Sequence, residues 1–365
     1  MRCKYRWFLP WSLFFIASLA AQAAEVSVDS DAVDFLPASD ARFHFEGRVD
    51  LANPAAPVAI WEGTRITVDF EGPHLVLCWG KGIGQIFFNV TVDGQTEIVG
   101  VPAGESARTP WPQSLSAGRH RLILFKRSEA TAGQVAFKGI EIGTGQKAWS
   151  PEAPVYKLRM EFQGDSITAG ACNEDGDKDQ WEDRRTHNFA LSYATIVAAD
   201  FGADLRCEAV SGIGVVTGWT EIKSGQMWDR IYPTKDSPRA DFTWQPDVLF
   251  INLGDNDDDF PRSHHQPFPT RFAVEYVKLV RAMRAANPHA HIVLLMGGMF
   301  GGSQSVPLRE AWMKALRQLE SSDAAINHFI FTHWYSNHPR VAEHRILAAE
   351  LTTWLKQQGF MKTYR

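Results

Sequence analysis

The sequence is poor in several features that mark whole classes of protein. It has only 4 cysteines in 365 residues, and none of them forms the closely spaced pair typical of a zinc-binding module. No internal apolar stretch approaches the roughly 20 residues needed to span a membrane, and no segment repeats with a solenoid period. The formal net charge of −5 gives no electrostatic support to a nucleic-acid partner. What remains is an ordinary globular composition, and the length predicts two domains.

The first residues resemble an export signal. Three basic residues precede an apolar run at residues 8–21, which leads into Ala21-Gln22-Ala23. A basic head, a short apolar middle and an A-x-A tail are typical of a secretory signal peptide. We therefore expect residues 1–23 to be cleaved and the mature protein to be periplasmic or secreted, free of the membrane. An uncleaved membrane anchor is the alternative.

Cleavage would remove Cys3 and leave Cys78, Cys172 and Cys207. Outside the cytoplasm an odd number of cysteines indicates either one disulfide and one buried thiol, or three thiols. Cys172 and Cys207 lie in the same predicted domain. We therefore expect these two to pair.

The N-terminal half of the mature chain has the pattern of a β-sandwich. Short runs rich in β-branched and aromatic residues alternate with turn signals such as Asp93-Gly94, and no segment shows helical periodicity. The predicted strands are residues 65–70, 75–79, 85–92, 119–126 and 134–142. This spacing favours a sandwich of jelly-roll type, which we assign to residues 26–148.

After the proline-bracketed segment 151–154 the pattern changes to alternating strands and helices. Predicted strands at 156–162, 205–210, 248–253, 292–296 and 329–332 alternate with predicted helices at 189–201, 271–286, 308–319 and 341–355. Such alternation predicts a mainly parallel sheet covered on both faces, here over residues 155–365. Sheets of this kind carry their chemistry in the loops beyond the carboxyl ends of the strands.

Four polar or glycine-containing segments follow predicted strands at that edge. Ser166 ends the first strand within Gly-Asp-Ser, Gly212 follows the second strand, Asn256 follows the third, and His338 follows the last. A serine and a histidine supply a nucleophile and its base, while a glycine N–H and an asparagine amide can stabilise an oxyanion. Together the four segments predict a serine hydrolase site.

At these four positions the chain resembles the SGNH (GDSL-like) hydrolase superfamily. Segments 45–50, 61–64 and 70–72 also resemble the β-sandwich of carbohydrate esterase family 2. The resemblance implies a three-layer α/β/α domain preceded by a β-sandwich. It further implies an esterase that removes O-acetyl groups from plant-type polysaccharides or oligosaccharides such as xylan and glucomannan.

The resemblance also implies roles for individual residues. Ser166 would be the nucleophile and His338 its base, and the N–H groups of Ser166 and Gly212 with the Asn256 side chain would form the oxyanion hole. No metal or organic cofactor is required. His333 and His344 are the alternatives for the base.

One departure from the superfamily concerns the group that orients the histidine. The usual aspartate three residues before His338 is replaced by Tyr335, and no acidic residue lies between Asp323 and His338. We expect a main-chain carbonyl within residues 334–336 to hold the imidazole. An acid that reaches in from elsewhere is the rival.

Two further groups of residues have less specific patterns. The acidic run 255–259 fails as a calcium loop, because Phe260 stands where glycine is required, and we expect a solvated loop. Among the tryptophans, those in predicted loops are the candidates for stacking on sugar rings, and Trp312 on a helical face is expected in the core. The loop tryptophans are Trp181, Trp219 and Trp334.

Two other functions fit the same residues: a non-catalytic carbohydrate-binding protein that keeps the fold, or a lipase or thioesterase on the same scaffold. The sequence leaves the oligomeric state open.

Overall fold

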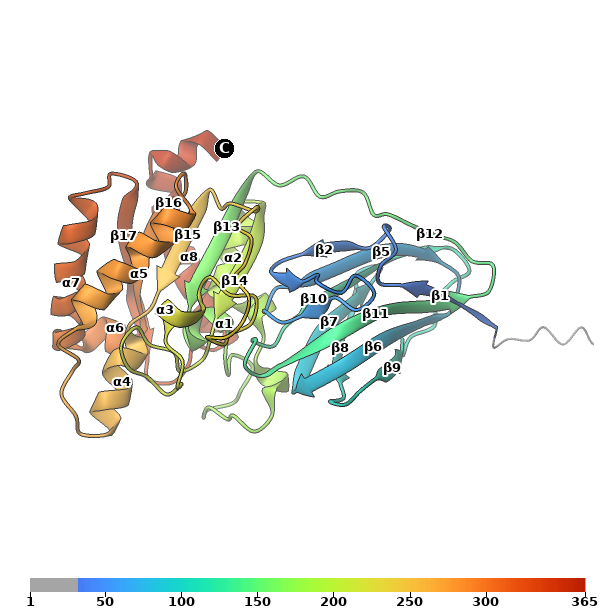
Figure 1. Cartoon of the computed structure of the whole chain (residues 1–365), viewed down its shortest axis with the longest axis horizontal. Coiled ribbons are helices and arrows are strands. Elements are labelled where there is room, and N and C mark those ends of the chain that lie inside the picture. Colours follow the sequence, from blue (N-terminus) through green and yellow to red (C-terminus); the bar gives the residue numbers. More distant parts are fainter. Residues whose placement is uncertain (1–31, 365) are drawn as a thin grey trace, which may run out of the picture. The chain divides into compact units, whose positions relative to one another are not determined.

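The computed structural model describes residues 32–364, and its first part is built from two antiparallel sheets (Figure 1). Sheet A has the strand order β3-β4-β11-β6-β9, with β1 also pairing with β11, and sheet B has the order β12-β5-β10-β7-β8, with β2 on β5. The strands are β1 (Val33–Pro37), β2 (His44–Glu46), β3 (Val49–Asp50), β4 (Val58–Ala59), β5 (Arg65–Glu71), β6 (Leu75–Gly84), β7 (Ile86–Val92), β8 (Gln95–Val101), β9 (Ala107–Pro110), β10 (Arg119–Lys126), β11 (Gly133–Gly143) and β12 (Ala148–Trp149).

The two sheets enclose one hydrophobic core. Trp79 on β6 and Phe137 on β11 belong to sheet A, and their rings are in contact, with a centroid distance of 5.7 Å. Phe88 on β7 of sheet B stacks on Trp79 at 5.0 Å. All three side chains are fully buried, so the sheets pack face to face as a sandwich. The sandwich and its five predicted strands are confirmed; the other strands described here, β1 to β4, β8, β9 and β12, were not predicted.

The second part is a five-stranded parallel sheet, sheet C, in the order β14-β13-β15-β16-β17. Its strands are β13 (Leu158–Gly164), β14 (Ala203–Ala209), β15 (Val248–Asn252), β16 (His291–Met299) and β17 (Ile326–Tyr335). The helices are α1 (Ser166–Ala169), η1 (Arg184–Thr186), η2 (Phe189–Leu191), α2 (Tyr193–Asp200), α3 (Ser224–Met227), α4 (Asp255–Ser263), α5 (Phe272–Ala286), α6 (Phe300–Gln304), α7 (Val306–Glu320), α8 (Val341–Gln357) and η3 (Phe360–Tyr364).

Helices cover both faces of sheet C (Figure 1). The apolar residues of α5 and α7 share one core with alternate side chains of the sheet, such as Leu249 and Ile251, and those of α2 and α8 share another with Val248 and Phe250. Every residue of β15 is buried, as expected for a central parallel strand. The three-layer architecture is therefore confirmed, and Trp312 lies in the core as predicted.

Buried polar contacts join the sandwich to the loops of the parallel-sheet part. The guanidinium of Arg48 donates to the carbonyl of Trp228 at 2.7 Å, and the indole N–H of Trp61 donates to the carbonyl of Ile231 at 2.7 Å. Because these donors are buried, losing their partners would leave unsatisfied groups in the interior. From Val33 onward the chain forms one compact unit, and the boundaries at residues 148 and 155 stay predictions.

The predicted signal peptide, residues 1–23, lies outside the described residues. Within residues 32–364, none of the helices combines the length and the apolar character that crossing a bilayer requires.

Candidate active site

Ser166 lies at the carboxyl end of β13, on the first turn of α1. Asp165 caps this helix by accepting the N–H of Ile167 at 3.0 Å. Gly164 is required just before the cap, because a Cβ atom there would lie 2.2 Å from the hydroxyl oxygen of Thr168. Ser166 lines a cavity although the residue is only 5% exposed.

His338 is hydrogen-bonded to Ser166. It lies between β17 and α8, and its Nε2 atom is 2.8 Å from the Ser166 Oγ atom. The two rival histidines lie elsewhere. His333 points to Glu350, and buried His344 accepts the N–H of Tyr193 at its Nδ1 atom. The predicted nucleophile and base are therefore brought together, in the geometry in which the imidazole can take the serine proton.

Asp179 holds the other nitrogen of the imidazole, and this corrects a prediction. The His338 Nδ1 atom lies 2.6 Å from Asp179 Oδ2, so the expectation of a main-chain carbonyl from residues 334–336 is wrong. Arg340 donates to the second oxygen, Asp179 Oδ1, at 2.7 Å. Burial would raise the pKa of Asp179, but the hydrogen bonds from His338 and Arg340 and the electrostatic interaction with His338 outweigh it and lower that pKa.

The sequence could not assign Asp179 because the acid comes from a loop, residues 170–188, that shows no periodicity. This carboxylate is 159 positions from the histidine it contacts, whereas the superfamily pattern places the acid three residues away. The only available signal was the acidic character of residues 174–179, just after the nucleophile.

Gly212 lies on the loop after β14, and its φ of +81° is readily adopted only by glycine. A Cβ atom at this position would also lie 2.9 Å from the Cβ of Trp219. Gly212 and Ser166 line the same cavity, which is where the predicted oxyanion hole requires their N–H groups.

Asn256 lines that cavity as well, at the start of α4. One N–H of its amide donates to Asp165 Oδ2 at 3.1 Å, which fixes the plane of the side chain. An amide nitrogen carries two hydrogens, so a second N–H is left for a substrate oxygen. Burial, and then the charge of Asp255, raise the pKa of Asp165 well above its ordinary value.

The acidic run 255–259 is not a solvated loop, which corrects a second prediction. It forms the first turns of α4, and Asp257 is fully buried. The carboxylate of Asp257 accepts three successive backbone N–H groups of the Gly212 loop, from Val215, Val216 and Thr217, at 2.7, 2.7 and 2.9 Å. These bonds replace the water that a carboxylate would otherwise need.

Glu129 fixes the same loop from the sandwich. Its side chain is 2% exposed, and its Oε2 atom accepts the N–H of Ser211, next to Gly212, at 2.7 Å. The Glu129 Oε1 atom lies 3.3 Å from the guanidinium of Arg184. Neither Glu129 nor Asp257 was singled out from the sequence as a contributor to the site.

The cavity has a volume of about 690 Å³ and is lined by both parts of the chain. Trp181 and Trp219 lie in its wall with 37% and 53% of their surface exposed, as substrate contacts require. The ring of Trp181 lies 5.1 Å from that of His338. Trp334 packs on Phe300 but is outside the lining that the described residues provide.

The three cysteines in residues 32–364 are free thiols, so the predicted pairing of Cys172 with Cys207 is wrong and the alternative of three thiols holds. Cys207 is buried on β14 beside Glu62, whereas the Cys172 sulfur faces His187. Cys172 belongs to two groups of possible metal ligands in the described part of the chain, one with Asp175 and His187 and one with Asp179 and His338.

A serine, a histidine and a carboxylate linked at the edge of a parallel sheet are the arrangement of a serine hydrolase. Comparison with known families agrees with this class. Residues 162–348, just over half of the chain, match the GDSL-like lipase/acylhydrolase family, and residues 45–152 match the carbohydrate esterase 2 N-terminal family. The chain therefore belongs to the GDSL-like lipase/acylhydrolase family, and the resemblance seen in the sequence is confirmed.

Individual relatives are carbohydrate esterases. The cellulase/esterase CelE of Acetivibrio thermocellus is 29% identical over 326 residues, which are 86% of this chain but only 39% of that protein. An acetylxylan esterase / glucomannan deacetylase of Cellvibrio japonicus is 26% identical over 86% of this chain and 91% of its own length. The solved structure of a family two carbohydrate esterase from Clostridium thermocellum in complex with cellohexaose is 29% identical, with a TM-score of 0.76 over 86% of this chain and 98% of that one.

Proposed function

We propose that this protein is a serine esterase that removes O-acetyl groups from plant-type polysaccharides or oligosaccharides, such as xylan and glucomannan. The observation that carries this proposal is the hydrogen-bonded chain from Ser166 through His338 to Asp179 in the wall of a cavity. The Cellvibrio relative is an acetylxylan esterase / glucomannan deacetylase, which supports the choice of ester and of sugar.

The first half-reaction forms an acetyl-enzyme. His338 Nε2 takes the hydroxyl proton of Ser166, and the serine oxygen attacks the acetyl carbon. Asp179 keeps a proton on His338 Nδ1 and stabilises the imidazolium that forms. The collapsing tetrahedral intermediate expels the sugar oxygen, which takes the proton from His338 Nε2 and leaves as an alcohol.

The developing oxyanion is stabilised by three N–H donors. These are the backbone N–H groups of Ser166 and Gly212 and the second N–H of the Asn256 amide. Ser166 is in the first turn of α1, where helix N–H groups have no partner within the helix. Such preorganised donors are each worth about 10²–10³ in turnover.

Water completes the reaction. It enters from the exposed side of the cavity, gives a proton to His338 Nε2 and attacks the acetyl carbon on Ser166. Acetate leaves and the serine recovers its proton, so neither a metal nor an organic cofactor takes part in these steps.

The experiment that tests the function is acetate release from acetylated xylan and acetylated glucomannan by the pure protein. Wild type should release acetate and Ser166→Ala should not. Activity on 4-nitrophenyl esters that rises steeply with acyl length would favour a lipase or thioesterase instead. If wild type and Ser166→Ala bind the sugars equally and are equally inactive, the protein is a non-catalytic carbohydrate-binding protein instead of an esterase.

The proposal includes export to the periplasm or the medium, which the basic and apolar character of residues 1–23 supports. N-terminal sequencing of the protein recovered outside the cytoplasm should begin just after Ala23. A protein that starts at Met1 in the cytoplasmic fraction would contradict export.

A further inference from the structure

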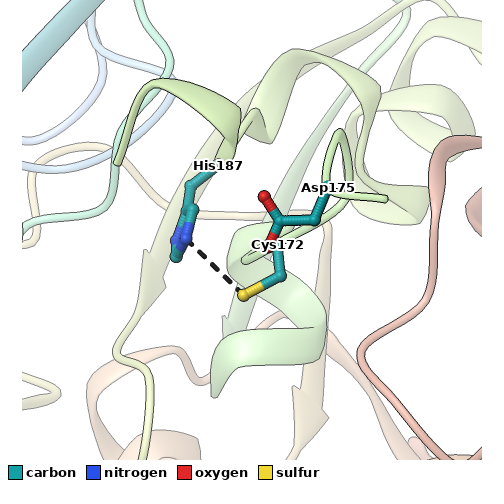
Figure 2. A group of neighbouring side chains, drawn as sticks. All are labelled: Cys172, Asp175 and His187. Atoms are coloured by element: carbon teal, nitrogen blue, oxygen red, sulfur yellow. Dashed lines mark hydrogen bonds between the residues drawn. The ribbon is translucent and has the colours of Figure 1, made fainter. Parts of the chain in front are cut away.

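Three possible metal ligands meet at the base of the loop that carries Asp179. Cys172 follows α1, His187 ends the short helix η1, and Asp175 lies between them in the sequence (Figure 2). Cys172 and His187 are buried, and the ligand atoms of all three residues lie within 4.8 Å of one another. Figure 2 shows the cysteine sulfur and the imidazole ring pointing toward each other. The loop therefore begins and ends at one cluster of a thiol, a carboxylate and an imidazole.

The spacing of these atoms is close to that of a tetrahedral zinc site. The Cys172 sulfur is 3.5 Å from His187 Nε2, and the carbonyl oxygen of Gln180 is 3.4 Å from the sulfur and 3.1 Å from Nε2. Zinc bonds of about 2.3 Å to sulfur and about 2.0–2.2 Å to nitrogen or oxygen place neighbouring tetrahedral ligands roughly 3.3–3.6 Å apart. These three atoms are therefore already spaced as neighbouring zinc ligands. The carboxylate of Asp175 lies within 4.8 Å of the sulfur and Nε2 and accepts the backbone N–H and the side-chain amide of Gln180 at 2.9 and 3.1 Å, so it must turn to reach the ion.

The donor set selects the kind of metal. A thiolate and an imidazole are ligands for zinc and similar thiophilic ions, whereas calcium and magnesium take oxygen ligands. The carboxylate of Asp175 completes a set of three side chains of different type, and the thiolate and carboxylate charges neutralise a divalent ion.

We propose that Cys172, Asp175 and His187, with the carbonyl oxygen of Gln180, form a zinc site that closes the loop carrying Asp179. Binding requires that the thiol proton leave Cys172 to solvent and that the proton on His187 be held at Nδ1 so that Nε2 can ligate. Arg184, whose guanidinium is now 3.4 Å from Nδ1, must move away; it also contacts Glu129 and the ring of Trp181. Zinc binding itself does not depend on the proposed esterase function.

A competing arrangement shares the same cysteine. Cys172, Asp179 and His338 also have ligand atoms within 4.8 Å of one another. A metal there would occupy the predicted base and its orienting acid. The two arrangements differ in the histidine they use, and this difference makes them distinguishable.

Cobalt titration of the full-length protein tests the site, because cobalt replaces zinc and gives a thiolate-to-metal charge-transfer band. Wild type should show this band at one cobalt per chain, and zinc should displace it. A wild-type protein without the band overturns the proposal.

Variants then assign the ligands. Cys172→Ser should abolish the band, and His187→Gln should weaken zinc binding by at least about 100-fold, since loss of a supporting partner alone costs 10- to 100-fold. The matched controls are Cys78→Ser, a buried thiol on β6, and His289→Gln, an exposed histidine, and both should bind as wild type does. Binding that survives His187→Gln and is lost in His338→Gln overturns the proposal in favour of the competing arrangement.

Two measurements on zinc-loaded wild type do not depend on the folding of any variant. X-ray absorption at the zinc edge should show one sulfur neighbour beside nitrogen and oxygen, and zinc without sulfur contradicts the site. Hydrogen exchange of residues 173–186 should slow when zinc is bound. Unchanged exchange at full occupancy contradicts the loop-closing role.

Discussion

The two walls of the cavity are held in different ways. On the side of Gly212, four backbone N–H groups of the loop are accepted by the buried carboxylates of Asp257 and Glu129. On the side of His338, the orienting acid Asp179 comes from a loop in which its own side chain is 19% exposed and Trp181 is 37% exposed. The side of the cavity that carries Gly212 is thus held by buried carboxylates, whereas the side that carries His338 is partly exposed to solvent.

This difference matches what each wall must do. Oxyanion donors act best when they are fixed before the reaction, because they then need no reorganisation in the transition state. The histidine side must admit substrate and water while holding one imidazole orientation. An ion pair with Arg340 and a hydrogen bond with His338 serve that purpose at a partly exposed carboxylate. Substitutions on the His338 side and on the Gly212 side should therefore have different effects.

The largest effect is expected on the histidine side. Asp179→Asn should lower kcat by about 10³–10⁴, because an amide cannot stabilise the imidazolium and can hold the wrong tautomer. Steady-state kinetics on 4-nitrophenyl acetate measures this, with Asp177→Asn in the same loop as the control. Near-wild-type turnover in Asp179→Asn would return the orienting role to a main-chain carbonyl.

On the oxyanion side, Asp257→Asn should lower kcat by about 10², with little change in KM. The amide offers one acceptor oxygen and turns an NH₂ group toward backbone donors, so the Gly212 loop must shift, and a displacement of about 1 Å can cost this much. Asp258→Asn on the same helix is the control, since its carboxylate contacts Ser305 and not the loop. If the loss appears only in KM, Asp257 does not position the oxyanion hole.

A group that supports the Gly212 side should also make the stability of the folded protein depend on pH. Burial raises the pKa of Glu62, which accepts the N–H of Ala209 just before the Gly212 loop, from 4.5 to about 7. The folded protein then binds this proton more tightly than the unfolded chain, so Glu62 makes the protein less stable as pH rises from about 4.5 to 7.

Glu62→Gln keeps an acceptor for Ala209 and removes the titration. Its stability relative to wild type should therefore increase between pH 4.5 and 7.5, by about 1–3 kcal/mol. Urea unfolding across this pH range is the measurement. A relative stability that stays constant with pH would show that Glu62 is charged in the folded state.

The smallest effect concerns the substrate. Trp219→Ala should raise KM for acetylated polysaccharide by about 3- to 10-fold through the loss of a stacking surface worth ~1 kcal/mol, and should leave 4-nitrophenyl acetate hydrolysis nearly unchanged. Trp334→Ala should change neither, because this residue lies outside the described lining of the cavity. Equal effects of the two variants would remove Trp219 from the proposed substrate surface.

The sequence predicted the parts of this molecule that local patterns determine. Buried strands such as β15 appear as short apolar runs, and the ends of parallel strands must meet, so Ser166, Gly212, Asn256 and His338 could be placed on one edge. Asp179 could not be placed, because it depends on the course of an irregular loop.

Other contributors were hidden for a different reason. A run of aspartates resembles a solvated segment unless backbone donors from elsewhere surround it, as they surround Asp257. Glu129 comes from the other half of the chain, and only the packing of the sandwich against the Gly212 loop shows its role. Cys172 and Cys207 were expected to pair because the cysteine number was odd and both lie in one predicted domain, and neither fact carries information on where the sulfur atoms point.

In the reaction we propose, the hydroxyl of Ser166 carries the acetyl group between the sugar and water. Acid quenching during turnover of 4-nitrophenyl acetate, followed by peptide mass spectrometry, tests it most directly. We expect an acetyl group on Ser166 in wild type and none in Ser166→Ala, whose turnover should also be lost. An acetyl group found on another residue, together with undiminished hydrolysis by Ser166→Ala, would contradict it.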